Sequence, residues 1–526
     1  MATAPAARTR LRAFSVSRYE AEVAEFHAER EEAYYQHLSG FRAELGTAPI
    51  LARHAGLFER RVVDHLRRRV GVARGGGARE RKLLAFATDG FIERDVAPLT
   101  DAIAAAESSA VVIWRGQRIG YRAIANRISE ISGRTERNAL LAAMLEVEEA
   151  INPQRARRLE RIQQLTVELG YADYPELIAE TRGFDPDALA VELRDFLTAS
   201  ETQYFAALRR HLARIEIEHG DATLADAWYL LRGAGFDHWF EATRLRPVLE
   251  ATLAGLGLDL ARTDGATLDL EPRPGKAPRA FVAAVRVPGD VRLVIQPHGG
   301  WDDYAAALHE AGHLAHFLHM DPGLHVPDRL LGEPTLTEGQ AFVFEALVGD
   351  PAFLGERLGL PQQSAADFAD FFALFWLYRM RRTAALLLSE LRLHRSDQEP
   401  IQRAQYAGLV GLLTGIQEPQ QRYLVAVDDG MYAAAYARAF MLGGSLSAWL
   451  EEAHGPRWWS AAAAGTALRG AWASGFSRSA EDAVASLGYD RLDWRPILRT
   501  IRAQLIGEMS GYGGPNITTR AGSRKV

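Results

Sequence analysis

Apolar residues spaced three and four apart recur through most of this chain, and this spacing constrains the fold more than any other feature. Charged residues fill the positions between them in segments such as YEAEVAEFHAEREEAYYQHLSGF, NALLAAMLEVEEAI and FADFFALFWLYRMRRTAALLLSELRLHR. The pattern is typical of amphipathic helices that bury one face in a core. The sequence therefore predicts a mainly α-helical protein.

Two short stretches depart from the helical pattern and predict β-hairpins. Residues 110–121 read AVVIWRGQRIGY, with a turn at Arg115-Gly116. Residues 279–297 read RAFVAAVRVPGDVRLVIQP and predict two strands joined at residues 288–290. We expect the second hairpin to be a small antiparallel β element directly before a histidine-rich helix.

Stretches rich in Gly, Pro or Asp mark breaks between helices at residues 71–82, 183–186, 263–278 and 321–334. A chain of 526 residues can form two or three domains, or one helical body divided into lobes. We expect an N-terminal helical lobe at residues 1–185 and a second region, which holds the histidine-rich segment, at residues 186–509; the two can interleave in space. Residues 510–526, Gly-rich and then basic, predict a disordered tail.

Composition excludes several classes of protein and site. With no cysteine, the chain cannot form a disulfide framework or a thiolate metal site, so a metal would need His and carboxylate ligands. Acidic and basic residues are interspersed and give a net charge of −6, which offers no electrostatic case for a nucleic-acid partner. No apolar run is long enough to span a bilayer, and no secretory signal is evident. We expect a cytoplasmic protein with no membrane partner; the sequence assigns no oligomeric state.

The segment LHEAGHLAHFLH, residues 308–319, carries the pattern HExxH. His309 and His313 are four residues apart, so a helix places both imidazoles on one face, as a tetrahedral zinc ion requires. Glu310 lies beside them and can act on a water bound to the metal. Asp302 could cap this helix, and Gly312 leaves room for a close neighbour. The alternative is a helix with incidental histidines, because HExxH occurs by chance in roughly a few per cent of chains this long.

Zinc hydrolases of this type take a third protein ligand from a later helix. Glu338, in TLTEGQAFVFEALVG, follows His313 by 25 residues and is the candidate. The alternative is a capping box, because Thr335 and Glu338 have the spacing with which such a pair closes the start of a helix. The HEAGH motif favours the ligand interpretation, since a site without a third ligand would be incomplete.

HEAGHLAH, followed by TEGQAFVFE with its two glutamates seven residues apart, resembles the thimet oligopeptidase and oligoendopeptidase F family of gluzincin zinc metallopeptidases. The resemblance is strong between residues 268 and 349. It implies a two-lobed helical clamp around a deep central channel, one Zn²⁺ per chain and hydrolysis of short peptides. In this family a further histidine often stands where this chain has His316, and a second glutamate where it has Glu345.

The resemblance also gives roles to residues at the site. Zinc on His309, His313 and Glu338 would activate water, and Glu310 would serve as general base. Tyr432 and Tyr436, in DDGMYAAAYARAF, match the family's transition-state tyrosines, although aromatics at this spacing are usually core residues.

Several features leave alternatives open. Thimet-type members carry a histidine and a Gly-rich loop before the tyrosines, whereas this chain has VAVDDGM, a departure that bears on how it binds and selects a substrate. His298, His316 and His319 could serve the site or be ordinary loop and helix residues. The leading hypothesis is a zinc oligopeptidase. The alternatives are a zinc carboxypeptidase or dipeptidase of the same superfamily and a non-hydrolytic metal- or peptide-binding relative.

Overall fold

The computed structural model describes residues 14–72, 77–259, 263–395 and 399–505. The tail at residues 510–526, for which the sequence predicts disorder, lies outside this range. The first part of the chain contains α1 (Val16–Leu38), α2 (Thr47–Arg53), α3 (Arg60–Val72), α4 (Ala78–Ser109), β1 (Val111–Trp114), β2 (Gln117–Gly120), α5 (Tyr121–Ser129), α6 (Arg134–Glu168) and α7 (Tyr174–Arg182).

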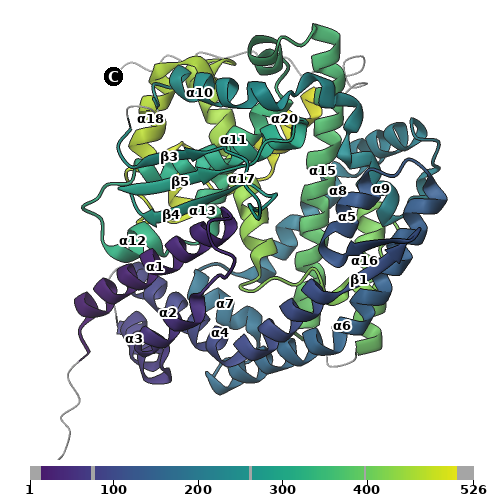
Figure 1. Ribbon diagram of the computed structural model, residues 1–526. Helices are drawn as coiled ribbons and strands as arrows, with labels where there is room; N and C mark the ends of the chain where they lie inside the picture. The colour runs from purple at the N-terminus through teal and green to yellow at the C-terminus, as the bar shows by residue number, and fades with distance from the viewer. Residues whose placement is uncertain (1–13, 73–76, 260–262, 396–398, 506–526) are drawn as a thin grey trace, which may run out of the picture.

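The middle of the chain carries the second group of strands and the histidine helix. Its elements are α8 (Pro186–Ala213), α9 (Leu224–Arg232), α10 (Leu245–Gly255), β3 (Ala266–Asp269), β4 (Phe281–Arg286), β5 (Asp290–Val294), α11 (Trp301–Leu318), α12 (Val326–Leu330) and α13 (Pro334–Glu345). The last part contains α14 (Pro351–Phe353), α15 (Gln362–Leu393), α16 (Glu399–Thr414), α17 (Tyr432–His454), α18 (Ala462–Trp472), α19 (Ala480–Ser486) and α20 (Arg495–Gln504). Helices dominate the described chain, which confirms the mainly α prediction (Figure 1).

Both predicted hairpins form. β1 pairs antiparallel with β2 around the turn at Arg115-Gly116, and β4 pairs antiparallel with β5. The second sheet differs from the prediction in one respect, because β3 joins it parallel to β5 and gives the order β3-β5-β4. The four residues of β3 lie in a stretch that the sequence predicts as a break. A strand this short, with Gly and Pro near both ends, shows no usable periodicity.

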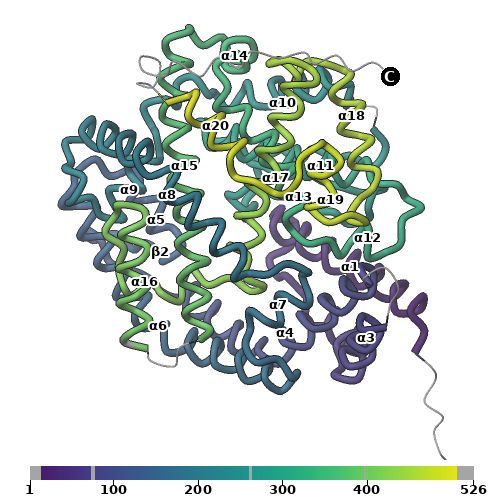
Figure 2. The backbone as a smooth tube through the Cα atoms, turned by 180° about the vertical axis from the view of Figure 1, so that it is seen from behind, coloured from purple at the N-terminus to yellow at the C-terminus, as the bar shows by residue number. Residues whose placement is uncertain are grey.

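Helix α13 is packed between α11 and α17 in the interior of the upper part of the molecule (Figure 2). Two glycines allow this close packing. A Cβ atom on Gly312 of α11 would lie 2.6 Å from the Cα of Ala341, and one on Gly443 of α17 would lie 3.0 Å from the carbonyl oxygen of Gly339. The expectation that Gly312 leaves room for a neighbour is therefore confirmed. The two contacts bring the backbones of three helices together at the middle of α13.

Contacts cross the proposed boundary at residue 185. The segment after α16 returns to α6, where Arg422 forms a 2.5 Å ion pair with Glu148 and the Asn152 amide donates to the carbonyl of Gln421. The long helix α15 packs against both α8 and α16. The division into two lobes around a channel stays a prediction, and these contacts show that sequence-distant segments share one helical layer.

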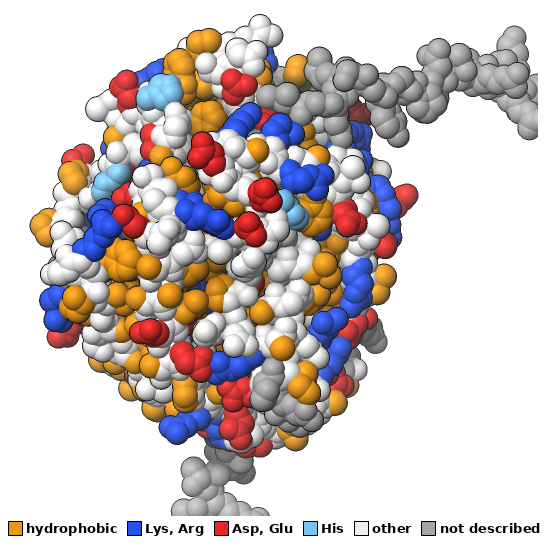
Figure 3. Space-filling view, turned by 90° about the vertical axis from the view of Figure 1, so that its right-hand side faces the viewer, with side chains coloured by type: hydrophobic (Ala, Val, Ile, Leu, Met, Phe, Trp, Pro, Cys, Tyr) orange, Lys and Arg blue, Asp and Glu red, His pale blue; other side chains and the backbone are white. Residues whose placement is uncertain are grey.

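None of the described helices is both long and apolar enough to cross a membrane. On the face shown in Figure 3, basic and acidic side chains are interspersed and do not gather by sign.

Candidate active site

Three side chains from two helices converge in the interior. His309 and His313 on α11 face each other with their Nε2 atoms 3.2 Å apart. Oε2 of Glu338, on α13, lies 3.2 Å from Nε2 of His309 and 3.8 Å from Nε2 of His313. Among the described residues, these three form a His-His-Glu group able to hold a metal ion. The structure thus brings together the three residues that the sequence predicts as ligands.

The spacing and the orientation of the two imidazoles fit a tetrahedral metal ion. Two nitrogen ligands at zinc–nitrogen distances of about 2.0 to 2.1 Å lie about 3.3 to 3.4 Å apart at a tetrahedral centre. Glu345 accepts a 2.8 Å hydrogen bond from Nδ1 of His309, and Oγ1 of Thr337 lies 2.7 Å from Nδ1 of His313. Such bonds fix the ring so that the Nε2 lone pair is presented to a metal. Two facing lone pairs and a carboxylate favour a cation between them.

The electrostatics of the group also favour positive charge. Burial alone would lower the pKa of His309, but its contacts with Glu338 and Glu345 raise it to about 10. Burial alone would raise the pKa of Glu338, but the hydrogen bond with His309 and the charges of both histidines lower it to about 2. Burial lowers the pKa of His313 to about 4. The Glu338 carboxylate is therefore ionised, and its negative charge favours a positive charge bound beside the two histidines.

The capping-box alternative for Glu338 is wrong. Helix α13 begins at Pro334 with Glu333 at its N-cap, and the Thr335 hydroxyl donates to the Glu333 carboxylate. The Glu338 carboxylate faces the two histidines. Proline at the first helical position moved the start of the helix, since it pre-sets the backbone there.

The predicted cap of the histidine helix is also wrong. Helix α11 begins at Trp301, and Asp302 lies within its first turn. Oδ2 of Asp303 instead accepts hydrogen bonds from the backbone N–H groups of His298 (2.5 Å) and Gly299 (2.7 Å). The paired glycines, with φ of +90° and +110°, turn the chain so that the second aspartate faces back to the loop.

Glu310, which the sequence predicts as general base, is half-buried on α11 beside strand β4. Burial raises the pKa of Glu310 to about 7, against the lowering effects of His309 and of a hydrogen bond from the backbone of Val282. A carboxylate with a pKa near neutrality can both take up and release a proton under ordinary conditions. Its role stays a prediction that this environment supports.

Both predicted tyrosines lie at the group. The Tyr432 hydroxyl donates a 2.7 Å hydrogen bond to Oε1 of Glu338. The ring of Tyr436 lies 4.9 Å from that of Tyr432 and also contacts the ring of Phe342. Both tyrosines line a cavity of about 470 Å³, so they are not simply core aromatics. Burial and the nearby Glu338 raise the pKa of Tyr432, and similar causes raise that of Tyr436 to about 12, so both phenols stay protonated.

Sequence reasoning missed two residues that support the ligands. Thr337 contacts His313, and Arg379 on α15 forms a 2.5 Å ion pair with the same Glu345 carboxylate that orients His309. A hydroxyl residue directly before the candidate ligand could have pointed to Thr337. Arg379 carries no such signal, because only the tertiary structure brings α15 beside α13.

The three other histidines near the motif, His298, His316 and His319, are not part of the His-His-Glu group. His316 is 3% exposed and packs against Phe317 and Phe476, and its Nδ1 has no hydrogen-bond partner among the described residues. His319 lies 2.8 Å from the carbonyl oxygen of Ala315 through Nδ1. His298 is exposed in the loop before α11. The structure thus places His316 and His319 in the helix packing, and none of the three among the ligands.

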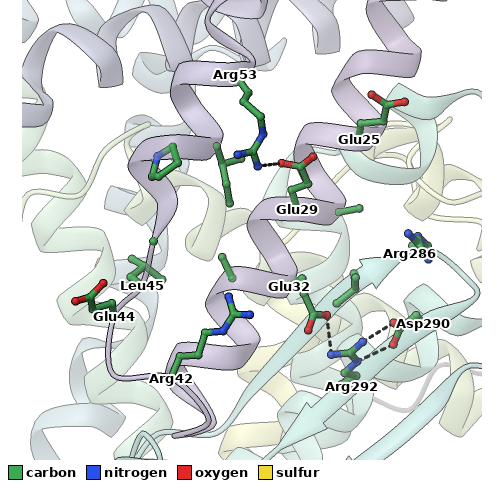
Figure 4. A pocket seen from close by; sticks show the side chains of 16 residues that line it. Glu25, Glu29, Glu32, Arg42, Glu44, Leu45, Arg53, Arg286, Asp290 and Arg292 are labelled. Carbon is green, nitrogen blue, oxygen red and sulfur yellow. Dashed lines mark hydrogen bonds and ion pairs between the residues drawn. The ribbon is translucent and has the colours of Figure 1, made fainter.

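A second cavity, of about 660 Å³, lies where α1, α2 and their connection face β4 and β5 (Figure 4). Some of its charged side chains are paired: Arg53 bonds to Glu29, and Arg292 bridges Glu32 and Asp290. None of the candidate ligands, the candidate base or the two tyrosines lines it, so it is separate from the His-His-Glu group.

No protein-family model matches the sequence, and no curated protein sequence matches it. Solved structures match over nearly the whole chain. One provisionally assigned as oligoendopeptidase F has a TM-score of 0.68 at 13% identity and covers 94% of this chain and 92% of its own. A provisionally assigned peptidase from Chlamydophila abortus has a TM-score of 0.62 at 12% identity, covering 93% and 89%. A provisionally assigned oligoendopeptidase F from Bacillus anthracis strain Ames has 0.63 at 12%, covering 91% and 89%. The chain therefore has the fold of these peptidase structures.

Proposed function

We propose that the protein is a zinc-dependent peptidase that hydrolyses short peptides. One observation carries the proposal: Nε2 of His309, Nε2 of His313 and Oε2 of Glu338 converge at distances that suit one divalent cation. Histidine and carboxylate ligands without cysteine are the set that catalytic zinc sites of this type use.

A bound zinc ion supplies Lewis acidity, polarising a substrate carbonyl and bringing the pKa of water from about 15.7 to about 7. The protein's own groups supply the proton transfers and the donors. Glu310, with its pKa raised to about 7, takes the proton from water and passes it to the leaving amine. Tyr432 keeps its proton and donates a hydrogen bond to the negative charge that develops on the carbonyl oxygen.

Peptides are proposed as the substrates because the similar solved structures are assigned as peptidases. The intact HExxH motif favours catalysis over simple binding. A binding protein could lose Glu310 without loss of the three candidate ligands.

Metal analysis combined with a peptide panel tests the proposal. Purified protein is expected to contain about one zinc per chain, to cleave internally quenched peptides, and to lose both zinc and activity in chelator. Restoring zinc should restore cleavage. Mass spectrometry of the products separates interior cleavage from removal of terminal residues, and so separates the oligopeptidase from the carboxypeptidase or dipeptidase alternative. A zinc-loaded protein that cleaves no peptide would refute the proposed function.

A further inference from the structure

The cavity beside the two tyrosines lies between α15 and α17, which run side by side (Figure 1). Its volume of about 470 Å³ falls within the usual range for ligand pockets. Tyr432 connects it to the candidate site, because the hydroxyl of this residue is bonded to Glu338. A substrate side chain next to the reacting bond could therefore extend into it.

The walls of this cavity combine small or apolar side chains with carboxylates. Thr383, Leu386 and Glu390 lie along one face of α15, and Ala433 stands opposite on α17. The loop before α17 closes the cavity with Ala426, Asp428 and Asp429. Apolar walls that lead to carboxylates suit a long side chain with a cationic end, because its methylene groups pack while its head stays paired.

Glu390 is the buried carboxylate of this cavity. Its residue is 4% exposed, and its Oε1 atom has no hydrogen-bond partner among the described residues. Nε2 of His394 lies 3.7 Å from this oxygen, which is within ion-pair range but too long for a hydrogen bond. Burial raises the pKa of Glu390 because its charge is poorly compensated. A buried carboxylate oxygen of this kind is costly unless a donor reaches it.

The loop with the two aspartates is held in place from outside the cavity. Arg158 of α6 pairs with Asp429 at 2.5 Å, and the Tyr174 hydroxyl accepts a hydrogen bond from the backbone of Gly430. Asp429 is thus already neutralised. Asp428 is an exposed residue that forms no hydrogen bond or ion pair with any residue in the described ranges, and partial burial of its carboxyl group raises its pKa. It is the second carboxylate of the cavity, beside Glu390.

One cationic residue, Arg279, also lines the cavity, but it is exposed at the rim. Its charge lowers the pKa of Asp428, and within the described ranges no ion pair joins the two residues. Glu390 is buried, whereas Arg279 and Asp428 are exposed. The buried charged group of the cavity is therefore acidic, and its exposed edge carries both signs of charge.

We propose that this cavity is a specificity pocket for a basic side chain, lysine or arginine, of the peptide substrate. The aliphatic part of the side chain packs against Leu386 and Ala433, and its charged end binds Glu390 and Asp428. This inference rests on the proposed peptidase function for its position in catalysis. The binding preference itself can be measured without turnover.

The test uses N-acetylated, internally quenched peptides that differ at one residue beside the cleaved bond, scanned on both sides of it. Lysine and arginine peptides are expected to exceed the norleucine and glutamate peptides in kcat/KM by about 10- to 100-fold. In Glu390→Gln this preference should fall to within about threefold, because kcat/KM for the lysine and arginine peptides falls. Asp428→Asn should lower the preference less. Glu25→Gln, which changes a carboxylate of the other cavity, should leave it intact.

A second measurement keeps the inference separate from catalysis. Binding of the same peptides to the zinc-loaded Glu310→Gln protein, followed by fluorescence anisotropy, should show the same preference for lysine and arginine. It should vanish when Glu390→Gln is added. No preference, or no binding of any basic peptide, would overturn the pocket even if the protein cleaves norleucine peptides. If binding became tighter only for peptides without the acetyl group, the carboxylates of the cavity would bind the amino terminus of a peptide. That result would also overturn the proposed pocket for a basic side chain. Basic-peptide binding without any cleavage would instead count against the proposed function alone.

Discussion

The Tyr432 hydroxyl donates a 2.7 Å hydrogen bond to Oε1 of Glu338, whose other oxygen faces His309 and His313. One carboxylate thus links α17 to the two imidazoles of α11. Because the phenol stays protonated, it is a hydrogen-bond donor that a substrate oxygen could accept from. The residue could serve the site twice, by orienting Glu338 and by stabilising charge on the substrate.

Replacing this hydroxyl tests the second role. Tyr432→Phe should lower kcat about 100-fold with little change in KM, because the lost bond acts mainly in the transition state. Steady-state kinetics on one quenched peptide measures kcat and KM separately. Tyr436→Phe is the comparison variant and should show a smaller loss, since its ring packs against Phe342 and Tyr432. An unchanged kcat in Tyr432→Phe would return this residue to a structural role.

Removing a candidate ligand tests the metal centre. His309→Ala should lose bound zinc and all activity, because two remaining ligands hold the ion far more weakly. Zinc content by mass spectrometry after dialysis checks this. His298→Ala, an exposed histidine eleven positions earlier, is the matched control and should keep one zinc per chain. Equal zinc content in the two variants would remove His309 from the site.

The candidate base can be separated from the ligands. Glu310→Gln keeps the size of the side chain but removes its basic oxygen, so zinc content should stay near one per chain while turnover is abolished. Zinc analysis and kinetics on the same preparation make the comparison. Full activity in this variant would refute the mechanism.

The close approach of α11 and α13 has its own test. Gly312→Ala places a Cβ atom 2.6 Å from the Cα of Ala341, so the helices must separate. We expect a loss of about 1 to 3 kcal/mol in the free energy of unfolding and weaker zinc binding, because Glu338 moves with α13. Gly408→Ala, in open space on α16, is the control. It should be neutral or stabilising by about 0.5 to 1 kcal/mol. Denaturant unfolding and competitive zinc titration measure both effects, and equal behaviour of the two variants would contradict the packing argument.

His316 predicts a pH dependence of stability. Burial lowers its pKa from 6.5 to about 3, so below pH 6.5 the unfolded chain takes up a proton that the folded protein refuses. The stability contributed by neutral His316 is present above pH 6.5 and is lost as the pH falls, by up to about 1.4 kcal/mol per pH unit. His316→Leu should flatten the slope of unfolding free energy between pH 6.5 and 4.5. Denaturant melts at several pH values measure that slope, and identical slopes in the two proteins would show that His316 does not contribute.

The sequence by itself determined the helical character, both hairpins and the three residues of the candidate metal site. Helical periodicity and turn residues act over a few neighbours, so a linear reading captures them. The spacing of His309 and His313 fixes their common face for the same reason. The sequence did not predict the short strand β3 or the starts of α11 and α13. Strand β3 depends on pairing with β5. The start of α11 depends on the paired glycines before it, and the start of α13 depends on Pro334.

Only the tertiary structure decided which of two local interpretations Glu338 follows. Its spacing from Thr335 allows a cap, and the carboxylate turns to the histidines because Gly312 lets α13 approach α11. The orienting pair of Glu345 and Arg379, and the orphaned oxygen of Glu390 in the cavity, likewise depend on α15 packing beside α13 and α17. Contacts between residues tens of positions apart leave no periodic trace in the sequence, whereas packing and burial set their distances and charges.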